Sequence, residues 1–204
     1  VVACKDFTSQ GITLQDFASL KNRIIDSERN GYGTELADIL STIDEQTAMD
    51  SETLKTRFWD MFIVDALIGN WDRHNGNWGF LVNTEKNEIK FSPIYDCGSC
   101  LNPMLEDCEL SKLSDVELKN LAINCYSCIK INGKKINYMS FLKQMENKDC
   151  NDAIRRVFER IKIDNIYELI ENMEEISDIR KNFYKKIIEI RYEILKEVYE
   201  KIVN

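Results

Sequence analysis

Apolar residues recur at intervals of three and four along most of the chain, which is the spacing of one helix face. The longest such pattern follows the capping residues Asp50 and Ser51 and is apolar on more than one face, so we expect this helix to be buried on most sides. The same spacing predicts further helices over 14–25 with Thr13 as cap, over 36–43, over 110–128, from 141 onward, and at least two after 165. The pattern therefore predicts a mainly α fold.

Asp65 is the one charged residue in the apolar stretch 61–69 of the long predicted helix. A carboxylate at this position could hydrogen-bond the loop that follows the helix. Because charged side chains are rarely buried, we favour a partly exposed position for Asp65.

Two short stretches change from helical spacing to the alternation of a half-buried strand. The first predicts strands over 78–83 and 88–94, joined by four polar residues. The second predicts a hairpin over 129–136, because Asn-Gly lies between two apolar alternations. The expected β structure is therefore a small island in a helical chain.

The register of the first hairpin places two polar residues near each other. If Asn83 pairs with Glu88, counting back along both strands puts Asn77 opposite Ile94, which is two residues before Asp96. We therefore expect Asn77 and Asp96 at the same end of the hairpin.

The charge of the chain argues against a nucleic-acid partner. The chain has 27 Lys and Arg against 35 Asp and Glu, a formal net charge of −8, with no run of five or more like charges, whereas a phosphate backbone is bound by clustered positive charge. No apolar run approaches the roughly 20 residues of a membrane-spanning helix, and the first residues lack a signal-peptide pattern. We expect a cytoplasmic protein with no direct nucleic-acid partner and no membrane partner.

The cysteines and the single histidine limit the metal chemistry. Seven cysteines, several of them in apolar surroundings, are typical of a reducing compartment, and one histidine cannot supply a Cys2His2 finger. Two Cys-x-x-Cys pairs, at 97–100 and 125–128, could hold zinc, but 24 residues separate them and the second pair lies in an apolar segment. We favour a packing role for these cysteines over zinc.

The polar loop after the long helix, together with the returning strand, contains the groups that phosphoryl transfer requires. Asp72 could orient the acceptor hydroxyl or take its proton, and Asn77, five residues later, could bind a metal through its amide oxygen. Asp96 could hold Mg²⁺ through its carboxylate, and His74 or Arg73 could offset phosphate charge. The step of five residues from Asp to Asn equals that of the kinase catalytic loop.

The residues at 70–77, Asn-Trp-Asp-Arg-His-Asn-Gly-Asn, and at 92–96, Ser-Pro-Ile-Tyr-Asp, resemble the catalytic loop and the metal-binding strand end of HipA-like kinases. The resemblance implies a protein-kinase-like C-terminal lobe of a bacterial serine/threonine kinase, with a small β-hairpin that carries the metal site. It implies a catalytic base at Asp72, Mg²⁺ ligands at Asn77 and Asp96, and ATP as phosphate donor. It also implies a protein substrate and the family's setting of toxin and antitoxin pairs.

The resemblance also assigns the opening of the chain to the hinge that hydrogen-bonds adenine, at Val2, Ala3 and Cys4. The whole chain, 1–204, is then expected to be one C-terminal lobe. Its parts are a hinge strand within 1–10, the catalytic loop and metal-binding hairpin within 50–100, and a helical subdomain over 101–204.

Two departures from the family pattern bear on function. Gly76 stands where the family usually has Lys, so one phosphate-facing charge is absent and its role falls to His74 or Arg73. The N-terminal lobe, with its Lys and partner Glu, is not found, and the turn at 31–33, Gly-Tyr-Gly, lacks the third glycine of a phosphate-binding loop. We interpret this turn as a helix end. We expect the missing lobe, and an antitoxin, as partners from further sequence or another polypeptide.

Two other functions stay open on the sequence. A regulatory or binding module could keep this lobe without transferring phosphate, and the missing adenine-covering lobe favours that alternative. Asp-Arg-His-x-x-Asn at 72–77 also resembles the loop of phosphoinositide-type kinases, which place Phe-Gly after the metal-binding Asp. Here Cys97-Gly98 follows Asp96, which favours the HipA-like interpretation.

Overall fold

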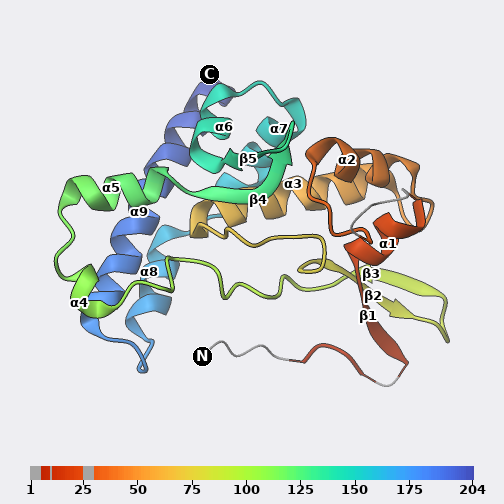
Figure 1. Cartoon of the computed structure of the whole chain (residues 1–204), viewed down its shortest axis with the longest axis horizontal. Coiled ribbons are helices and arrows are strands. Elements are labelled where there is room, and N and C mark those ends of the chain that lie inside the picture. Colours follow the sequence, from red (N-terminus) through yellow and green to blue (C-terminus); the bar gives the residue numbers. More distant parts are fainter. Residues whose placement is uncertain (1–5, 10, 25–29) are drawn as a thin grey trace. The chain divides into compact units, whose positions relative to one another are not determined.

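The computed structural model describes residues 6–9, 11–24 and 30–204. Helices dominate, which confirms the prediction of a mainly α fold. The predicted hinge residues Val2, Ala3 and Cys4 lie outside the described residues. The elements shown in Figure 1 are β1 (Ile12–Asp16), α1 (Phe17–Ile24), α2 (Leu36–Glu45), α3 (Ser51–Ile68), β2 (Gly79–Asn83), β3 (Glu88–Phe91), α4 (Asp107–Leu110), α5 (Asp115–Ile123), β4 (Tyr126–Ile131), β5 (Lys134–Asn137), α6 (Tyr138–Gln144), α7 (Lys148–Phe158), α8 (Ile163–Glu171) and α9 (Asp178–Val203).

The chain divides into two compact units. The first unit comprises Val1–Phe58, Asp72–Gly98 and Ser127–Ile136. The second comprises Trp59–Trp71, Ser99–Tyr126 and Asn137–Asn204. The predicted catalytic and metal-binding residues, from 72 to 96, all belong to the first unit.

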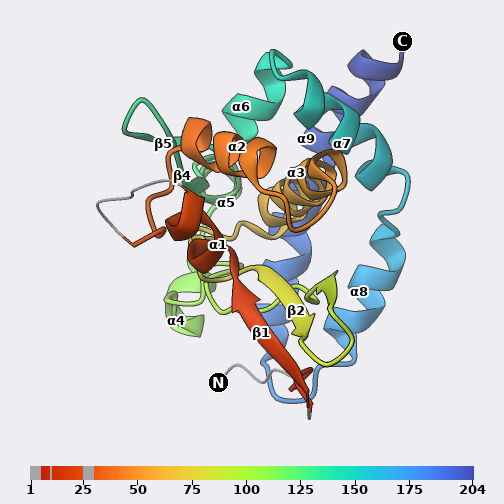
Figure 2. The same cartoon turned by 90° about the vertical axis from the view of Figure 1, so that its right-hand side faces the viewer.

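The first unit is built on an antiparallel sheet with the strand order β1-β2-β3, seen in Figure 2. Asn83 pairs with Glu88, so the predicted register of the first hairpin is confirmed. Strand β1 pairs along the other edge of β2, from Ile12 opposite Asn83 to Asp16 opposite Gly79. The end of β2 that adjoins the polar loop is therefore covered on both edges.

The prediction of a helix from residue 14, capped by Thr13, is wrong. Residues 12–16 form β1, and α1 begins only at Phe17. Asp16 caps this helix, because its Oδ1 accepts a hydrogen bond from the Ser19 N–H at 2.8 Å. Pairing with β2, which is distant in sequence, supplies backbone hydrogen bonds that outweigh the local helical pattern.

Trp78 attaches helix α1 to the loop that precedes β2. Phe17 stacks on the Trp78 ring with centroids 4.1 Å apart, and Phe58 of α3 lies 5.8 Å from the same ring. The first N–H groups of a helix have no partner inside it, and here those of Phe17 and Ala18 donate to the carbonyls of Trp78 and Asn75 at 2.9 Å. The start of α1 therefore fixes both the packing and the backbone of this loop.

The second predicted hairpin is confirmed as β4 and β5. Its turn residues Asn132 and Gly133 have φ values of 51° and 76°, as a tight hairpin turn requires. The Glu35 carboxylate accepts hydrogen bonds from the N–H groups of Asn132 at 2.5 Å and Gly133 at 3.1 Å. Because β4 begins at Tyr126 and α5 ends at Ile123, the predicted continuous helix over 110–128 is wrong.

Helix α9 organises the second unit. Helices α4, α5, α6, α7 and α8 all contact it, and Figure 1 shows it as the long blue helix. The predicted amphipathic helices near the C-terminus are confirmed as α8 and α9. Among the described residues, no helix is both long enough and apolar enough to cross a membrane. The buried side chains of α9 include Phe183, Ile187, Ile188, Ile194, Leu195 and Val198.

Asp65 is only 1% exposed, so the expectation of a partly exposed carboxylate is wrong. Its Oδ1 accepts a hydrogen bond from Nδ2 of Asn70 at 3.0 Å, and its carbonyl accepts from the Asn70 N–H at 2.9 Å. The carbonyl of Asn70 accepts from the Tyr138 hydroxyl at 2.7 Å. The buried carboxylate therefore fixes the chain where α3 ends, two residues before Asp72 in sequence.

Arg191 of α9 is buried beside the C-terminal ends of two helices. Its Nε donates to the carbonyl of Ala122, near the end of α5, at 3.2 Å. Its guanidinium also packs on Gly69, directly after α3, so closely that a Cβ on Gly69 would lie 2.4 Å from Nη1. Burial lowers the pKa of Arg191. Helix C-termini carry partial negative charge, which compensates part of the cost of burying this cation.

The Gly69→Ala variant is expected to lose about 3 kcal/mol of unfolding free energy, because φ is 69° and the added Cβ collides with Arg191. Gly133→Ala is the matched control. Its φ is 76°, but in the described part of the chain nothing lies within 4 Å of the added Cβ, so only the backbone conformation costs about 1 kcal/mol. Urea unfolding measures both losses. Equal losses would contradict the role of the collision.

Candidate active site

Residues 72–77 form a tight loop that is held by its own hydrogen bonds. The Asp72 carbonyl accepts from the His74 N–H and from Nδ2 of Asn77, both at 2.9 Å. The Asn77 N–H donates to the His74 carbonyl at 2.9 Å. Since Nδ2 of Asn77 is committed to Asp72, and Oδ1 accepts no hydrogen bond from the described residues, Oδ1 is the atom of this side chain that can bind a ligand.

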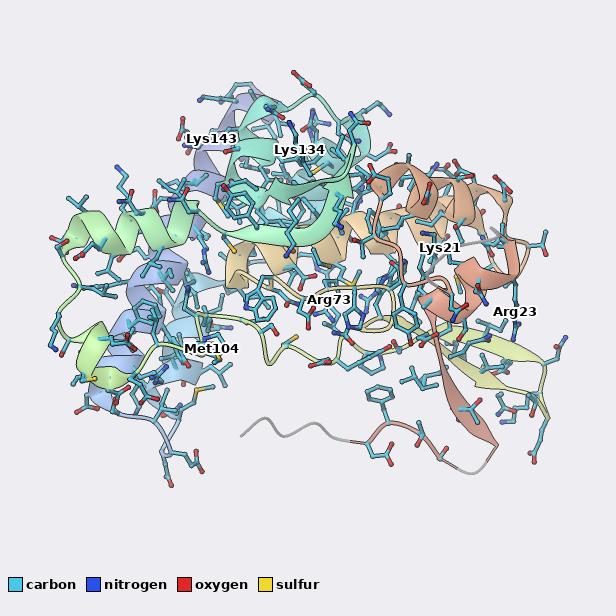
Figure 3. The ribbon with its side chains drawn as sticks, in the orientation of Figure 1. Lys21, Arg23, Arg73, Met104, Lys134 and Lys143 are labelled. Atoms are coloured by element: carbon cyan, nitrogen blue, oxygen red, sulfur yellow. The ribbon has the colours of Figure 1, made fainter. Side chains whose placement is uncertain are left out.

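Arg73, labelled in Figure 3, attaches this loop to the segment that follows β3. The side chain is 1% exposed, and its Nη1 donates to the carbonyls of Asn77 and Tyr95 at 2.5 Å each. Its Nη2 donates to Sγ of Cys97 at 3.3 Å. Asp96 lies between Tyr95 and Cys97 in sequence, so both of its neighbours are bound by Arg73. The contacts indicate a positioning role, and the contact of Arg73 with phosphate stays a prediction.

Asp96 is exposed and has a φ of 52°, in the left-handed region that residues with side chains seldom adopt. Such conformations persist only where the surrounding structure holds them, and they cluster at functional sites. Here Ser92 extends the hairpin toward Asp96, because its N–H and its Oγ both donate to the Gly79 carbonyl at 3.0 Å. The backbone therefore presents the Asp96 carboxylate to solvent beside the loop.

Tyr95 makes a second connection between the two segments. Its hydroxyl donates to the Gly76 carbonyl at 3.0 Å. Burial, together with the nearby carboxylate of Asp16, raises the pKa of Tyr95 to about 12, so the hydroxyl stays protonated at neutral pH and keeps donating. The ring of Phe7 lies 5.8 Å from the Tyr95 ring, which places the segment 6–9 near Asp96.

A hydrogen bond from its neighbour favours one tautomer of the neutral His74 imidazole. Its Nδ1 accepts a hydrogen bond from the Gly76 N–H at 3.1 Å. Because an N–H group can only donate, Nδ1 carries no proton, and the proton of the neutral imidazole lies on Nε2. His74 therefore offers one N–H donor, as its predicted role toward phosphate requires.

Sequence reasoning missed the role of Asn75. The side chain is 1% exposed, and its Nδ2 donates to the carbonyls of Gly31 and Gly33 at 2.8 Å each. Lys21, labelled in Figure 3, is fully buried, donates to the Gly33 carbonyl at 2.7 Å and lies 3.6 Å from the Asp38 carboxylate. The turn at 31–33 is therefore attached to the catalytic loop. An Asn in a polar loop gives no sequence signal of such a distant partner.

The donor set suits a metal that arrives with a nucleotide. Within the described ranges, no group of three or more His, Cys, Asp and Glu side chains could hold a metal ion, and this includes the cysteine pairs at 97–100 and 125–128. Mg²⁺ usually keeps several waters and binds through one or two carboxylates plus substrate phosphates. The amide oxygen of Asn77 and the carboxylate of Asp96 fit a ligand set of that kind.

Comparison with known proteins identifies a family and two similar proteins. The model of the HipA-like C-terminal domain family matches residues 5–173. The serine/threonine-protein kinase CtkA of Helicobacter pylori (strain J99 / ATCC 700824) is 46% identical over 195 residues, which cover 94% of this chain and 60% of that protein. The crystal structure of a Helicobacter pylori proinflammatory kinase CtkA matches with a TM-score of 0.91 and 42% identity, over 98% of this chain and 74% of that one. The chain thus spans less than two thirds of the length of the first relative.

Arg73→Lys is expected to lower the free energy of unfolding by about 2 kcal/mol, because one flexible ammonium cannot replace the planar fork that reaches Asn77, Tyr95 and Cys97. Arg23→Lys, at the exposed end of α1, is the matched control and should change it by at most about 0.5 kcal/mol. Both values come from urea unfolding. If Arg73→Lys behaves like the control, the guanidinium bridge does not hold the loop.

Proposed function

The chain belongs to the family of HipA-like C-terminal domains, and on this basis we propose that it transfers the γ-phosphate of ATP to a serine or threonine hydroxyl of a protein. The observation that carries the proposal is the attachment of two segments by Arg73. One segment holds Asp72 and Asn77, and the other holds Asp96. The name of the relative CtkA, a serine/threonine-protein kinase, supports a protein substrate.

Asp72 orients the acceptor hydroxyl and takes its proton as the oxygen bonds to the γ-phosphorus and the bond to the β-phosphate oxygen breaks. The Asp72 carbonyl accepts hydrogen bonds from His74 and Asn77. These bonds fix the backbone from which the Asp72 side chain extends. The Nε2–H of His74 donates to the phosphate. Asn77, through Oδ1, and Asp96 would hold Mg²⁺, which would neutralise phosphate charge when bound.

The adenine is proposed to bind at the hinge formed by Val2, Ala3 and Cys4. The contact between Phe7 and Tyr95 supports this proposal. Phe7 follows the proposed hinge by three residues, and Tyr95 directly precedes Asp96 in sequence. The chain covers 60% of its CtkA relative, so we propose that further sequence or a second polypeptide supplies the adenine-covering lobe. A cytoplasmic toxin role with an antitoxin partner belongs to the same proposal.

A regulatory module without phosphate transfer is the second candidate. Calorimetric titration with Mg·ATP distinguishes the two, when it is carried out on the 204-residue chain and on a version with the neighbouring lobe restored. The kinase proposal requires nucleotide binding in at least the longer version. Protein and phosphoinositide substrates offered side by side with labelled ATP separate protein from lipid kinase activity.

Asp72→Asn is expected to reduce phosphate transfer by about 10²- to 10⁴-fold, because an amide cannot take the proton of the acceptor. Transfer of label from ATP to protein measures the loss, and circular dichroism checks that the variant stays folded. Asp164→Asn, an exposed residue in the first turn of α8, is the control and should keep full activity. Full activity in Asp72→Asn would remove the assignment of the base.

Asp96→Asn is expected to raise the Mg²⁺ concentration needed for half-maximal ATP binding by about 10- to 100-fold, because one charged ligand becomes neutral. ATP titrations at a series of Mg²⁺ concentrations give this value. Glu88→Gln removes an exposed carboxylate at the other end of the same hairpin and should leave it unchanged. An equal Mg²⁺ requirement in Asp96→Asn and wild type would exclude Asp96 as a ligand.

A further inference from the structure

Tyr32 is exposed to 48%, yet the backbone on both sides of it is anchored to the catalytic loop. The carbonyls of Gly31 and Gly33 accept hydrogen bonds from Nδ2 of the buried Asn75 at 2.8 Å. Lys21 adds a third bond, to the Gly33 carbonyl at 2.7 Å. Because both flanking carbonyls are hydrogen-bonded, the backbone position of Tyr32 is fixed relative to the loop.

The Tyr32 ring contacts the imidazole of His74. The two rings meet edge to face, with centroids 5.9 Å apart and planes inclined at 61°, which is a favourable aromatic arrangement. The Tyr32 hydroxyl lies 3.5 Å from Oδ2 of Asp16, the residue that caps α1. The imidazole therefore has two separate contacts: the Tyr32 ring, and the Gly76 N–H that donates to Nδ1.

Gly76 leaves the space that the Tyr32 ring fills. A Cβ on residue 76 would lie 2.8 Å from Cε1 of Tyr32 and 3.2 Å from Nδ1 of His74. Gly76 does not have a positive φ, so lack of space, and not the backbone conformation, excludes a side chain there. The Gly76 carbonyl is held by the Tyr95 hydroxyl, so the backbone is not free to move aside. A side chain at 76 would have to displace Tyr32 or His74.

We propose that Tyr32 is a positioning residue of the candidate active site, which holds the His74 imidazole in the form with its proton on Nε2. A side chain at 76 and the Tyr32 ring compete for one place, so the lack of a side chain at Gly76 allows the ring to reach the imidazole. The part of this proposal that concerns phosphate transfer rests on the proposed function, whereas the positioning of the imidazole does not.

The single histidine makes a direct test practical, since ¹⁵N-labelled histidine gives signals from one imidazole only. Under conditions where the imidazole is neutral, the 204-residue chain is expected to show one tautomer, with the proton on Nε2. Tyr32→Phe keeps the ring and this tautomer, whereas Tyr32→Leu yields a mixture of both tautomers. Tyr126→Leu, which replaces a tyrosine of β4 with 47% exposure, is the matched control and keeps the wild-type signals.

Gly76→Ala provides a second variant that does not alter Tyr32 itself. Its Cβ would lie closest to the Tyr32 ring, at 2.8 Å, and also 3.1 Å from the imidazole, so it separates the two rings and is expected to give the same mixture of tautomers as Tyr32→Leu. The double variant should show no more than either single change, because both remove one contact. An additive effect would contradict a shared contact.

Phosphate transfer is measured on the same variants. Tyr32→Leu is expected to lower kcat about tenfold with little change in KM for ATP, and Tyr32→Phe to restore it. If Tyr32→Leu and Gly76→Ala keep the single tautomer, the proposal is overturned whatever the activity. If the tautomer changes while kcat stays at the wild-type value, the link to transfer is overturned. If the wild-type chain transfers no phosphate but the tautomer responds, the proposed function fails and the positioning stands.

Discussion

The buried guanidinium of Arg73 is the contact on which the candidate active site depends. A buried cation is costly unless hydrogen bonds replace its water, and here two backbone carbonyls and a sulfur atom do so. Those acceptors come from the catalytic loop and from the segment after β3. The hydrogen bonds that compensate the burial of the Arg73 charge therefore also connect the backbone segment of Asn77 to the backbone segment of Asp96.

Buried and partly exposed residues alternate along residues 72–77. Arg73, Asn75 and Asn77 are buried, at 1%, 1% and 6% exposure, and each makes hydrogen bonds that hold the loop. Asp72 and His74, between them, stay partly exposed. Hydrogen bonds of buried polar side chains can hold an irregular segment rigid without a large apolar core. The partly exposed residues of the same segment are then available to contact a ligand.

The sequence predicted the parts of the fold that local pattern determines. Two short strand-like segments and the four-residue connection between them were sufficient for the pairing of Asn83 with Glu88. It did not predict β1 or the burial of Asp65, because both depend on partners elsewhere in the chain: β2 for the strand, and Asn70 and its neighbours for the carboxylate. Asn75 was missed for the same reason, since the carbonyls that it binds precede it by more than forty residues.

The Mg²⁺ ligands and the nucleotide are coupled under the proposed function. Asn77 and Asp96 would be the protein ligands of Mg²⁺, and phosphate oxygens and waters would supply the other ligands. Under the same proposal, phosphates would meet the carboxylates of Asp72 and Asp96 in a chain of net charge −8, and a bound metal ion would reduce this repulsion. Each ligand therefore raises the affinity for the other, and by linkage the two effects are equal. Because the loop is held by its own hydrogen bonds, this coupling is electrostatic and does not require either ligand to order the loop.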